Sequence, residues 1–164
     1  MQIAVLSDIH DHIGRLREAL EKVADCDRLL CCGDLCSPFI VSELGDRFEG
    51  PIDLVWGNND GDTYRLTETA ADYGSISVHG EFGELDLGGR SIALIHFDGI
   101  GRRLAESDRY DLVCFGHNHR REISKVGETL LCNPGEVMGE LRGEPTCARY
   151  DTSSGEAAFV PLGT

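Results

Sequence analysis

The sequence contains very little lysine and few positive charges of any kind. Lysine occurs only as Lys22 and Lys125, and 15 basic residues stand against 29 acidic ones, which gives a formal net charge of −14. A field of this sign repels nucleic acid, so we exclude general nucleic-acid binding. An acidic, lysine-poor surface is typical of a cytoplasm with high salt, where screening weakens self-repulsion. The alternative to this high-salt interpretation is an ordinary acidic bacterial or archaeal protein, which would have the same composition.

Long hydrophobic runs are absent as well. No apolar run approaches the ~20 residues that span a bilayer, so we expect no membrane segment. The N-terminus, MQIAVLSDIHD, has no basic segment and reaches an acidic side chain at Asp8, which predicts a first strand rather than a secretion signal. The hydrophobic fraction is an ordinary 41% of 164 residues. We therefore expect one cytoplasmic domain over residues 1–164.

The cysteines do not form the paired motifs of a disulfide scaffold. They number seven, which is odd, and several lie in apolar runs such as RLLCCGDLC. Buried, reduced thiols are therefore favoured over disulfides. A zinc site built from Cys31, Cys32 and Cys36 stays open as an alternative, although no C-x-x-C pair elsewhere would complete it.

Short apolar runs alternate with helical spacings along the first half of the chain. The predicted strands cover 2–7, 27–33 and 51–57, and the predicted helices cover 13–25, 37–46 and 62–74. The second half predicts a hairpin over 76–97 with a Gly-Gly turn at 88–89, a helix over 99–111, and strands over 112–116, 121–127, 129–133, 146–151 and 156–162. Such a mixed order is typical of a layered α/β sandwich.

Polar side chains follow successive predicted strands at the points where the strands end. They are Asp8 and His10; Asp34; Asn58, Asn59 and Asp60; His96; and His117 and His119. Each group alone has an ordinary explanation as a turn or a core histidine. Ligands of open α/β sheets bind beyond the carboxyl ends of the strands, so the joint occurrence favours one shared site.

This set of side chains suits a pair of divalent cations. Imidazole and carboxylate ligands together suit Mn, Fe, Zn, Ni or Co. Residues two apart in an extended segment point the same way, so Asp8 and His10 can converge on one ion. Asp34 has two carboxylate oxygens and is the candidate bridge, while the amide oxygen of Asn58 is a neutral ligand that can also touch substrate.

The motifs DIH, GD, GNND, H and GHNH, in this order, resemble those of the calcineurin-like metallophosphoesterases. The short chain and NPGE (Asn133–Glu136) resemble the small phosphodiesterase branch, which also contains the Vps29 scaffold proteins. The resemblance implies a four-layer α/β/β/α sandwich of two mixed β-sheets flanked by helices. It places Asp8, His10, Asp34 and His119 on one metal, and Asp34, Asn58, His96 and His117 on the other.

The resemblance implies a phosphodiesterase in which a hydroxide bridging two divalent metals attacks a small phosphodiester. We expect manganese, with nickel, iron, zinc or cobalt as alternatives. Asn58 and Asn59 are candidate substrate contacts, and Asp60 is expected to orient a ligand such as His10 or His96. The arginines that follow the GHNH motif or lie near the C-terminus are either phosphate contacts or solvated surface: Arg120, Arg121 and Arg142.

Two departures from the family pattern bear on catalysis. Asn59 stands where the family often has histidine or cysteine, and Asp98 stands where it often has a second histidine after His96. Asp98 is either a proton donor or an ordinary exposed side chain. A non-catalytic, metal-binding scaffold of the same fold and a phosphomonoesterase stay open as alternatives, as does association into homo-oligomers. His12 and His79 match no ligand position and are predicted to lie on the surface or in loops.

Overall fold

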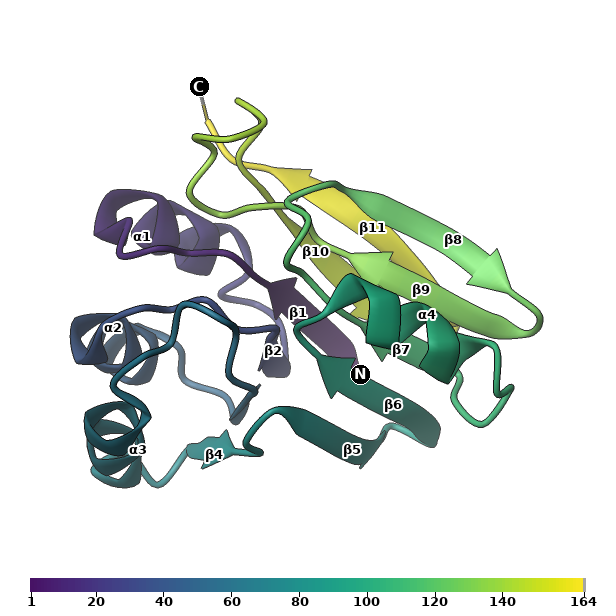
Figure 1. Ribbon diagram of the computed structural model, residues 1–164, viewed down its shortest axis with the longest axis horizontal. Helices are drawn as coiled ribbons and strands as arrows, with labels where there is room; N and C mark the ends of the chain where they lie inside the picture. The colour runs from purple at the N-terminus through teal and green to yellow at the C-terminus, as the bar shows by residue number, and fades with distance from the viewer. Residues whose placement is uncertain (164) are drawn as a thin grey trace.

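The first half of the chain builds a parallel sheet that two C-terminal strands extend (Figure 1). The computed structural model describes residues 1–163. This sheet, sheet A, has the strand order β11-β10-β1-β2-β3-β4. Its strands are β1 (Gln2–Leu6), β2 (Arg28–Cys31), β3 (Ile52–Leu54), β4 (Ile76–Val78), β10 (Thr146–Asp151) and β11 (Glu156–Pro161). β1 to β4 pair in parallel, whereas β10 is antiparallel to β1 and to β11.

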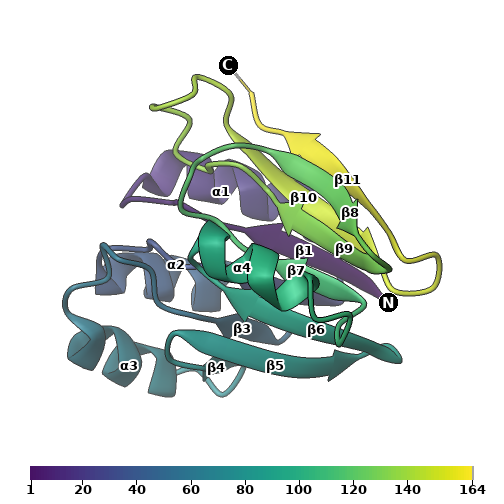
Figure 2. The same cartoon turned by 45° about the vertical axis from the view of Figure 1, so that its right-hand side comes forward.

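The second sheet, sheet B, has the order β5-β6-β7-β9-β8. Its strands are β5 (Phe82–Leu87), β6 (Arg90–Ile95), β7 (Leu112–Cys114), β8 (Glu122–Val126) and β9 (Thr129–Asn133). The central strands β6, β7 and β9 are parallel, and an antiparallel strand closes each edge. Figure 2 shows the two sheets stacked on each other.

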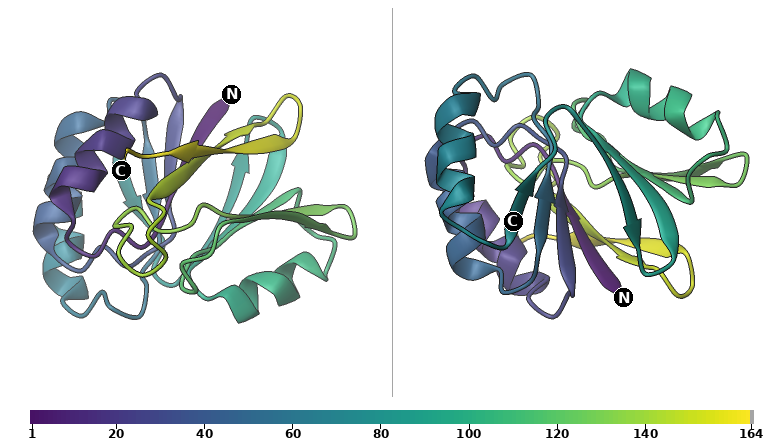
Figure 3. Two further views of the ribbon diagram at one scale, coloured as in Figure 1. Left: turned by 90° about the horizontal axis from the view of Figure 1, so that it is seen from above. Right: turned by 90° about the horizontal axis from the view of Figure 1, so that it is seen from below.

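Helices cover the outer faces of both sheets, as Figure 3 shows from above and below. The helices are α1 (Ile13–Lys22), α2 (Pro38–Arg47), α3 (Thr63–Ala71) and α4 (Asp98–Ala105). The first three pack on sheet A, and α4 packs on β6, β7 and β9 of sheet B. The expected four-layer α/β/β/α sandwich is therefore confirmed.

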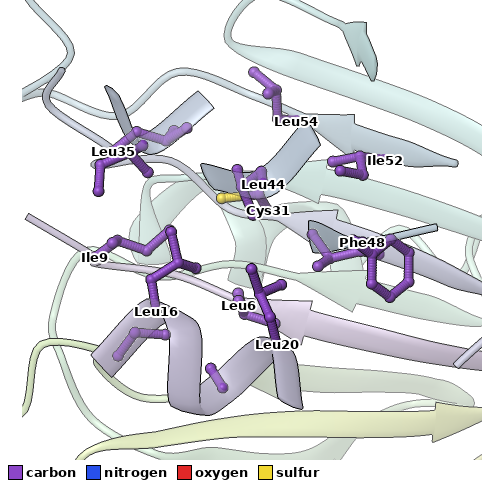
Figure 4. Close-up of a cluster of buried hydrophobic side chains, with 14 of the residues drawn as sticks. Leu6, Ile9, Leu16, Leu20, Cys31, Leu35, Leu44, Phe48, Ile52 and Leu54 are labelled. Atoms are coloured by element: carbon purple, nitrogen blue, oxygen red, sulfur yellow. The ribbon is translucent and has the colours of Figure 1, made fainter. Parts of the chain in front are cut away.

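Three apolar cores hold these layers together. Alternate residues of β1 point to different cores: Ala4 and Leu6 lie under the helices, and Ile3 and Val5 lie between the sheets. Because both faces of the strand are buried, its sequence is a continuous apolar run rather than an alternating one. Figure 4 shows the core under the helices, where Leu6 of β1 lies among side chains of α1 and α2.

Most predicted elements are present, with different ends. The helices predicted over 13–25, 62–74 and 99–111 end earlier, at Lys22, Ala71 and Ala105. The predicted hairpin over 76–97 was partly wrong: β5 and β6 form it around Gly88–Gly89, but β4 pairs with β3 in the other sheet.

Among residues 1–163 no helix is long and apolar enough to cross a membrane.

The three clustered cysteines do not converge on one point. Cys31 and Cys32 are successive residues at the end of β2, so they point to opposite faces of sheet A and belong to different cores. Cys36 lies in the loop beyond the strand and is half-buried. The alternative of a zinc site from these residues therefore has no geometric support.

Candidate metal centre

Four polar side chains meet at the carboxyl ends of β1 and β2 and after β7; we call them the first cluster. Its members are Asp8, His10, Asp34 and His119. Asp8 Oδ1 lies 3.4 Å from His119 Nε2 and 3.8 Å from His10 Nε2. Asp34 Oδ2 lies 3.4 Å from His10 Nε2. Two carboxylate oxygens and two imidazole nitrogens therefore face a common point.

A second cluster lies against the first and shares Asp34 with it. Its other members are Asn58, His96 and His117, which follow β3, β6 and β7. Asn58 Oδ1 lies 3.0 Å from His96 Nε2 and 2.8 Å from His117 Nδ1. Asp34 Oδ2 lies 3.4 Å from His96 Nε2. The same carboxylate oxygen thus faces both clusters, which suits a ligand shared by two ions.

Hydrogen bonds at the other ring nitrogen orient two of the imidazoles. His96 Nδ1 lies 2.7 Å from the carbonyl oxygen of Cys32, and His119 Nδ1 lies 2.7 Å from Glu136 Oε2. Because a carbonyl or carboxylate oxygen only accepts, each Nδ1 carries a hydrogen, so that in the neutral ring Nε2 has the lone pair that a metal ligand needs. These hydrogen bonds fix the orientation of both rings and leave their Nε2 atoms facing the clusters.

Asp60 is buried and holds the loop that carries Asp34. Its carboxylate accepts four backbone N–H groups at 2.7–2.9 Å, those of Asp34, Leu35, Cys36 and Gly57. Burial raises its pKa, and the hydrogen bonds oppose that effect. We expected Asp60 to orient a ligand such as His10 or His96; its hydrogen bonds lie instead to backbone amides, including that of Asp34, another proposed ligand.

The loops of the site adopt strained backbone conformations. Positive φ values occur at five of the predicted ligands: Asp8 (54°), His10 (45°), Asp34 (56°), His117 (71°) and His119 (60°). The left-handed region costs an ordinary residue roughly 1–2 kcal/mol. A glycine at position 57 relieves part of the crowding, because a Cβ there would lie 2.2 Å from Asp34 Oδ1. Strain concentrated in the loops that carry the clusters is typical of a functional site.

The carboxylates and imidazoles of the clusters stabilise one another's charged forms. Asp8 raises the pKa of His10 above its ordinary value, and Asp34 adds to the effect. We attribute the Asp8 effect to charge attraction, because 3.8 Å is longer than a hydrogen bond. Burial lowers the pKa of His96, but the Asp34 carboxylate outweighs it and the net shift is upward. Burial likewise opposes ionisation of Asp34, yet hydrogen-bond donors and the His96 charge hold its pKa well below its usual range.

The residues fit a bound cation. Asp8 Oδ1 and His10 Nε2 are buried and, within residues 1–163, have no hydrogen-bond partner. Leaving such atoms unpaired is costly unless something else satisfies them. Both atoms are metal-ligating types and face the centre of the first cluster. Two overlapping groups have ligand atoms within 4.8 Å of one another: Asp8, His10 and His119; and Asp8, Asp34 and His96.

The remaining predicted site residues lie around the clusters. Asn59 donates to Asp34 from its backbone and its side chain. Asp98 is half-buried at the start of α4 and accepts a hydrogen bond of 3.1 Å from Asn118. His12 caps α1, while His79 is partly buried and pairs with the buried Asp53 at 2.8 Å.

Sequence reasoning missed the contact of Glu136 with the first cluster. This residue is fully buried, and its carboxylate binds both His119 Nδ1 and the backbone N–H of Arg142. The NPGE motif was the available signal, because a glutamate after a turn glycine is unusual in a core.

Cys36 Sγ lies 3.6 Å from His10 Nδ1, and burial together with nearby carboxylates raises the pKa of its thiol to about 12. The thiol is therefore neutral near pH 7.

The fold and the paired clusters define the class of the protein: a two-sheet α/β sandwich with a candidate dinuclear metal centre at the strand ends. The chain belongs to the calcineurin-like phosphoesterase superfamily, whose domain matches residues 1–155. The resemblance drawn from the strand-end motifs is thereby confirmed.

Known relatives match the chain over nearly its full length. Phosphodiesterase MJ0936 of Methanocaldococcus jannaschii is 31% identical over 166 residues, with 99% of each chain covered. A solved archaeal phosphodiesterase is similar with a TM-score of 0.92 and 30% identity, and covers 99% of this chain and 100% of its own. Vps29 from Cryptosporidium parvum shares the fold at a TM-score of 0.67 and 18% identity, over 99% of this chain and 98% of its own.

Proposed function

We propose that the chain is a metal-dependent phosphodiesterase whose two clusters hold two divalent ions, with manganese preferred. The observation that carries the proposal is the position of Asp34 Oδ2, 3.4 Å from both His10 Nε2 and His96 Nε2. A carboxylate oxygen shared between two imidazole-rich clusters suits a bridging ligand. When bound, two divalent ions supply Lewis acidity that activates water as a nucleophile and neutralises charge on a phosphoryl group.

The side chains of the site would then bind and orient the substrate. Asn58 Oδ1 faces His96 and His117, so its amide nitrogen is the part that can donate to a phosphoryl oxygen. The sequence makes Asn59 a second candidate donor of this kind. Its Nδ2 donates to Asp34 Oδ2 at 2.9 Å, so we now propose that Asn59 positions Asp34 and leaves phosphate binding to Asn58.

Asp98 is the proposed proton donor to the leaving group. It lines the same pocket as His117 and His119, and the hydrogen bond from Asn118 fixes its carboxylate there. Nitrophenolate leaves without a proton, whereas an alkoxide needs one. We therefore expect activated phosphodiesters, which need no proton donor, to turn over faster than alkyl esters, which depend on Asp98. Equal rates on both would contradict proton transfer to the leaving group as the limiting step.

Two observations favour the diesterase over the alternatives. All seven proposed ligand positions hold metal-ligating side chains within the clusters, which argues against a scaffold whose site has lost its metal ligands. The relative at 31% identity is a phosphodiesterase, which favours diesters over monoesters.

The test is hydrolysis of bis-p-nitrophenyl phosphate by chelated protein refilled separately with Mn, Ni, Zn and Mg. His117→Ala runs alongside as the variant that lacks one ligand of the second cluster. We expect metal-restored turnover in the unchanged chain and its collapse in the variant. Turnover that survives chelation, or that His117→Ala leaves intact, contradicts the proposal.

A further inference from the structure

The pocket beside the metal centre is lined by arginines. It has a volume of about 670 Å³, and two of the proposed metal ligands, His117 and His119, form part of its wall. Arg102, Arg120, Arg121 and Arg142 line the rest together with Asn118 and two acidic residues. We call it the arginine pocket. A substrate whose phosphorus lies beside these two histidines can extend into it.

We propose that the arginine pocket binds a second phosphate group, and that the substrates are phosphodiesters that carry an additional phosphate. The inference rests on the proposed function and names its substrate class. Four guanidinium groups gather here in a chain whose net charge is −14. Clustered like charges repel unless an anion lies between them, and phosphate suits the planar fork of guanidinium.

Two of the four arginines are free to take that anion. Most arginines of the chain form ion pairs; in the pocket Arg102 pairs with Glu122 and Arg121 pairs with Glu144. In the part of the chain that the structure describes, the arginines without an acidic partner are Arg109, Arg120 and Arg142. Two of these three lie in the arginine pocket. An acidic protein that leaves guanidinium groups unpaired there has them available for a ligand.

Arg142 is fixed relative to the metal centre at both its backbone and its side chain. Its N–H donates to Glu136 Oε1 at 2.6 Å, and the other oxygen of Glu136 binds His119 Nδ1 at 2.7 Å. Its Nη2 donates to the carbonyl of Asn118 at 3.2 Å, between the two histidines. The backbone of Arg142 is therefore tied to the first cluster, and one hydrogen bond directs its exposed guanidinium group to the turn that carries His117 and His119.

Arg120 directly follows His119 in the sequence and belongs to the same turn as Asn118. Its backbone N–H donates to Asn118 Oδ1 at 2.9 Å, while its side chain is exposed. Asn118 thus joins the two arginines: it receives one hydrogen bond from each and donates another to Asp98. Two guanidinium groups beside one turn can share a phosphate that has several free oxygens.

A matched pair of substrates tests the proposal. Thymidine 5′-(p-nitrophenyl phosphate) and its 3′-phosphate share the reacting phosphorus and the leaving group and differ only in the second phosphate. We expect the 3′-phosphate to have a kcat/KM about tenfold higher, since hydrogen bonds to a charged group are worth that much. Arg120→Ala and Arg142→Ala should bring the ratio of the two kcat/KM values towards one.

Arg109→Ala is the control, because Arg109 is an exposed arginine without an acidic partner in residues 1–163 and lies outside the arginine pocket. It should leave the ratio unchanged at constant ionic strength. Equal kcat/KM values for the two substrates in the unchanged chain overturn the proposal. So does a ratio that falls equally in Arg109→Ala, because general charge would then explain the preference.

A binding measurement separates this inference from the proposed function. Thymidine 3′,5′-bisphosphate and thymidine 5′-monophosphate are titrated calorimetrically into the unchanged chain, Arg142→Ala and Arg109→Ala. Tighter binding of the bisphosphate that is lost only in Arg142→Ala supports the arginine pocket even if no ester is hydrolysed. Equal binding of both nucleotides overturns it, whether or not the chain is a phosphodiesterase.

Discussion

Asn59 donates a hydrogen bond to each carboxylate oxygen of Asp34. Its backbone N–H binds Oδ1 and its side-chain Nδ2 binds Oδ2, each at 2.9 Å. Oδ2 is also the oxygen that faces His10 and His96. The residue that departs from the family pattern at this position therefore sets the orientation of the one side chain that both clusters share.

Replacing Asn59 by alanine should weaken metal binding without unfolding the chain. The variant keeps the backbone hydrogen bond to Oδ1 and loses the side-chain bond to Oδ2. Removing an outer partner of a ligand typically costs about 10–100-fold in metal affinity or activity. Competition with a fluorescent chelator measures the manganese affinity. An affinity equal to that of the unchanged chain would contradict the role of Asn59 in positioning Asp34.

Glu136→Gln should act on the first cluster through His119. The buried carboxylate accepts hydrogen bonds from His119 Nδ1 and from the N–H of Arg142, and a glutamine has only one oxygen to accept them. We expect a loss of metal affinity of about 10–100-fold. Glu140→Gln is the matched control, because Glu140 is 72% exposed and its nearest basic partner, His12, is 3.9 Å away. Equal affinities in the two variants would contradict the assigned role.

Gly116→Ala should destabilise the fold at the metal centre. A Cβ at this position would lie 1.9 Å from Ser7 Oγ and 2.6 Å from Asp8 Oδ2, so β1 and the turn after β7 would have to separate. Overpacking of this kind costs about 1–3 kcal/mol. Gly99→Ala is the control: its Cβ meets nothing within 4 Å, and in helix α4 it should stabilise the chain by about 0.5–1 kcal/mol. Urea unfolding of the chelated protein measures both, and equal midpoints would contradict the packing argument.

Metal uptake should release protons and strengthen as the pH rises. The pKa values of His10 and His96 are raised, so these imidazoles hold protons to a higher pH than a free imidazole, whose pKa is about 6.5. A metal binds the neutral ring and must displace those protons. Calorimetry of manganese binding in two buffers of different ionisation enthalpy counts them. Binding that is independent of buffer and pH would contradict the assignment of these two ligands.

The same shifts fix how the stability of the chelated protein depends on pH. Pairing with Asp34 raises the pKa of His96, so this stabilisation is fully present below the pKa of the unfolded imidazole and is lost as the pH rises through the folded value. The lowered pKa of Asp34 stabilises the folded state at pH values above the unfolded pKa of about 3.9. This stabilisation is lost as the pH falls through the folded pKa. Chelated protein should therefore become less stable above neutral pH, while metal-loaded protein should not.

Asp98→Asn should slow poor leaving groups more than good ones. If Asp98 gives a proton to the departing oxygen, its loss costs about 10²–10⁴-fold for an ester that needs the proton and little for nitrophenolate. The measurement compares the phenyl and p-nitrophenyl esters of thymidine 5′-phosphate in both chains. An equal loss on the two esters would assign Asp98 to a structural role through Asn118.

The strand-end rule explains why most of the site could be predicted from the sequence. Asp8, Asp34 and Asn58 follow parallel strands of one sheet, whose carboxyl ends meet at a common edge, so proximity follows from topology. His96 and His117 follow parallel strands of the other sheet. Local patterns of apolar residues were sufficient to find these strands, because most are buried on both faces.

What the sequence could not reveal depends on contacts between distant segments. The loop after β9 folds back so that Glu136 reaches His119; the NPGE motif marks the glutamate but does not reveal its partner. Asn59 was predicted to face substrate, but its carboxylate partner 25 residues earlier decides where its amide points. The assignment of β4 to sheet A likewise depends on its pairing with β3, since a short strand followed by a turn fits either sheet.

The most direct test of the account is to count and locate the metal ions. Chelated protein is refilled with manganese, its metal content is measured by mass spectrometry, and crystals of it are examined by anomalous scattering. We expect two ions per chain, one in each cluster with Asp34 between them, and one ion in His117→Ala, because His117 belongs only to the second cluster. A single ion in the unchanged chain, or ions bound away from Asp34, would contradict the account.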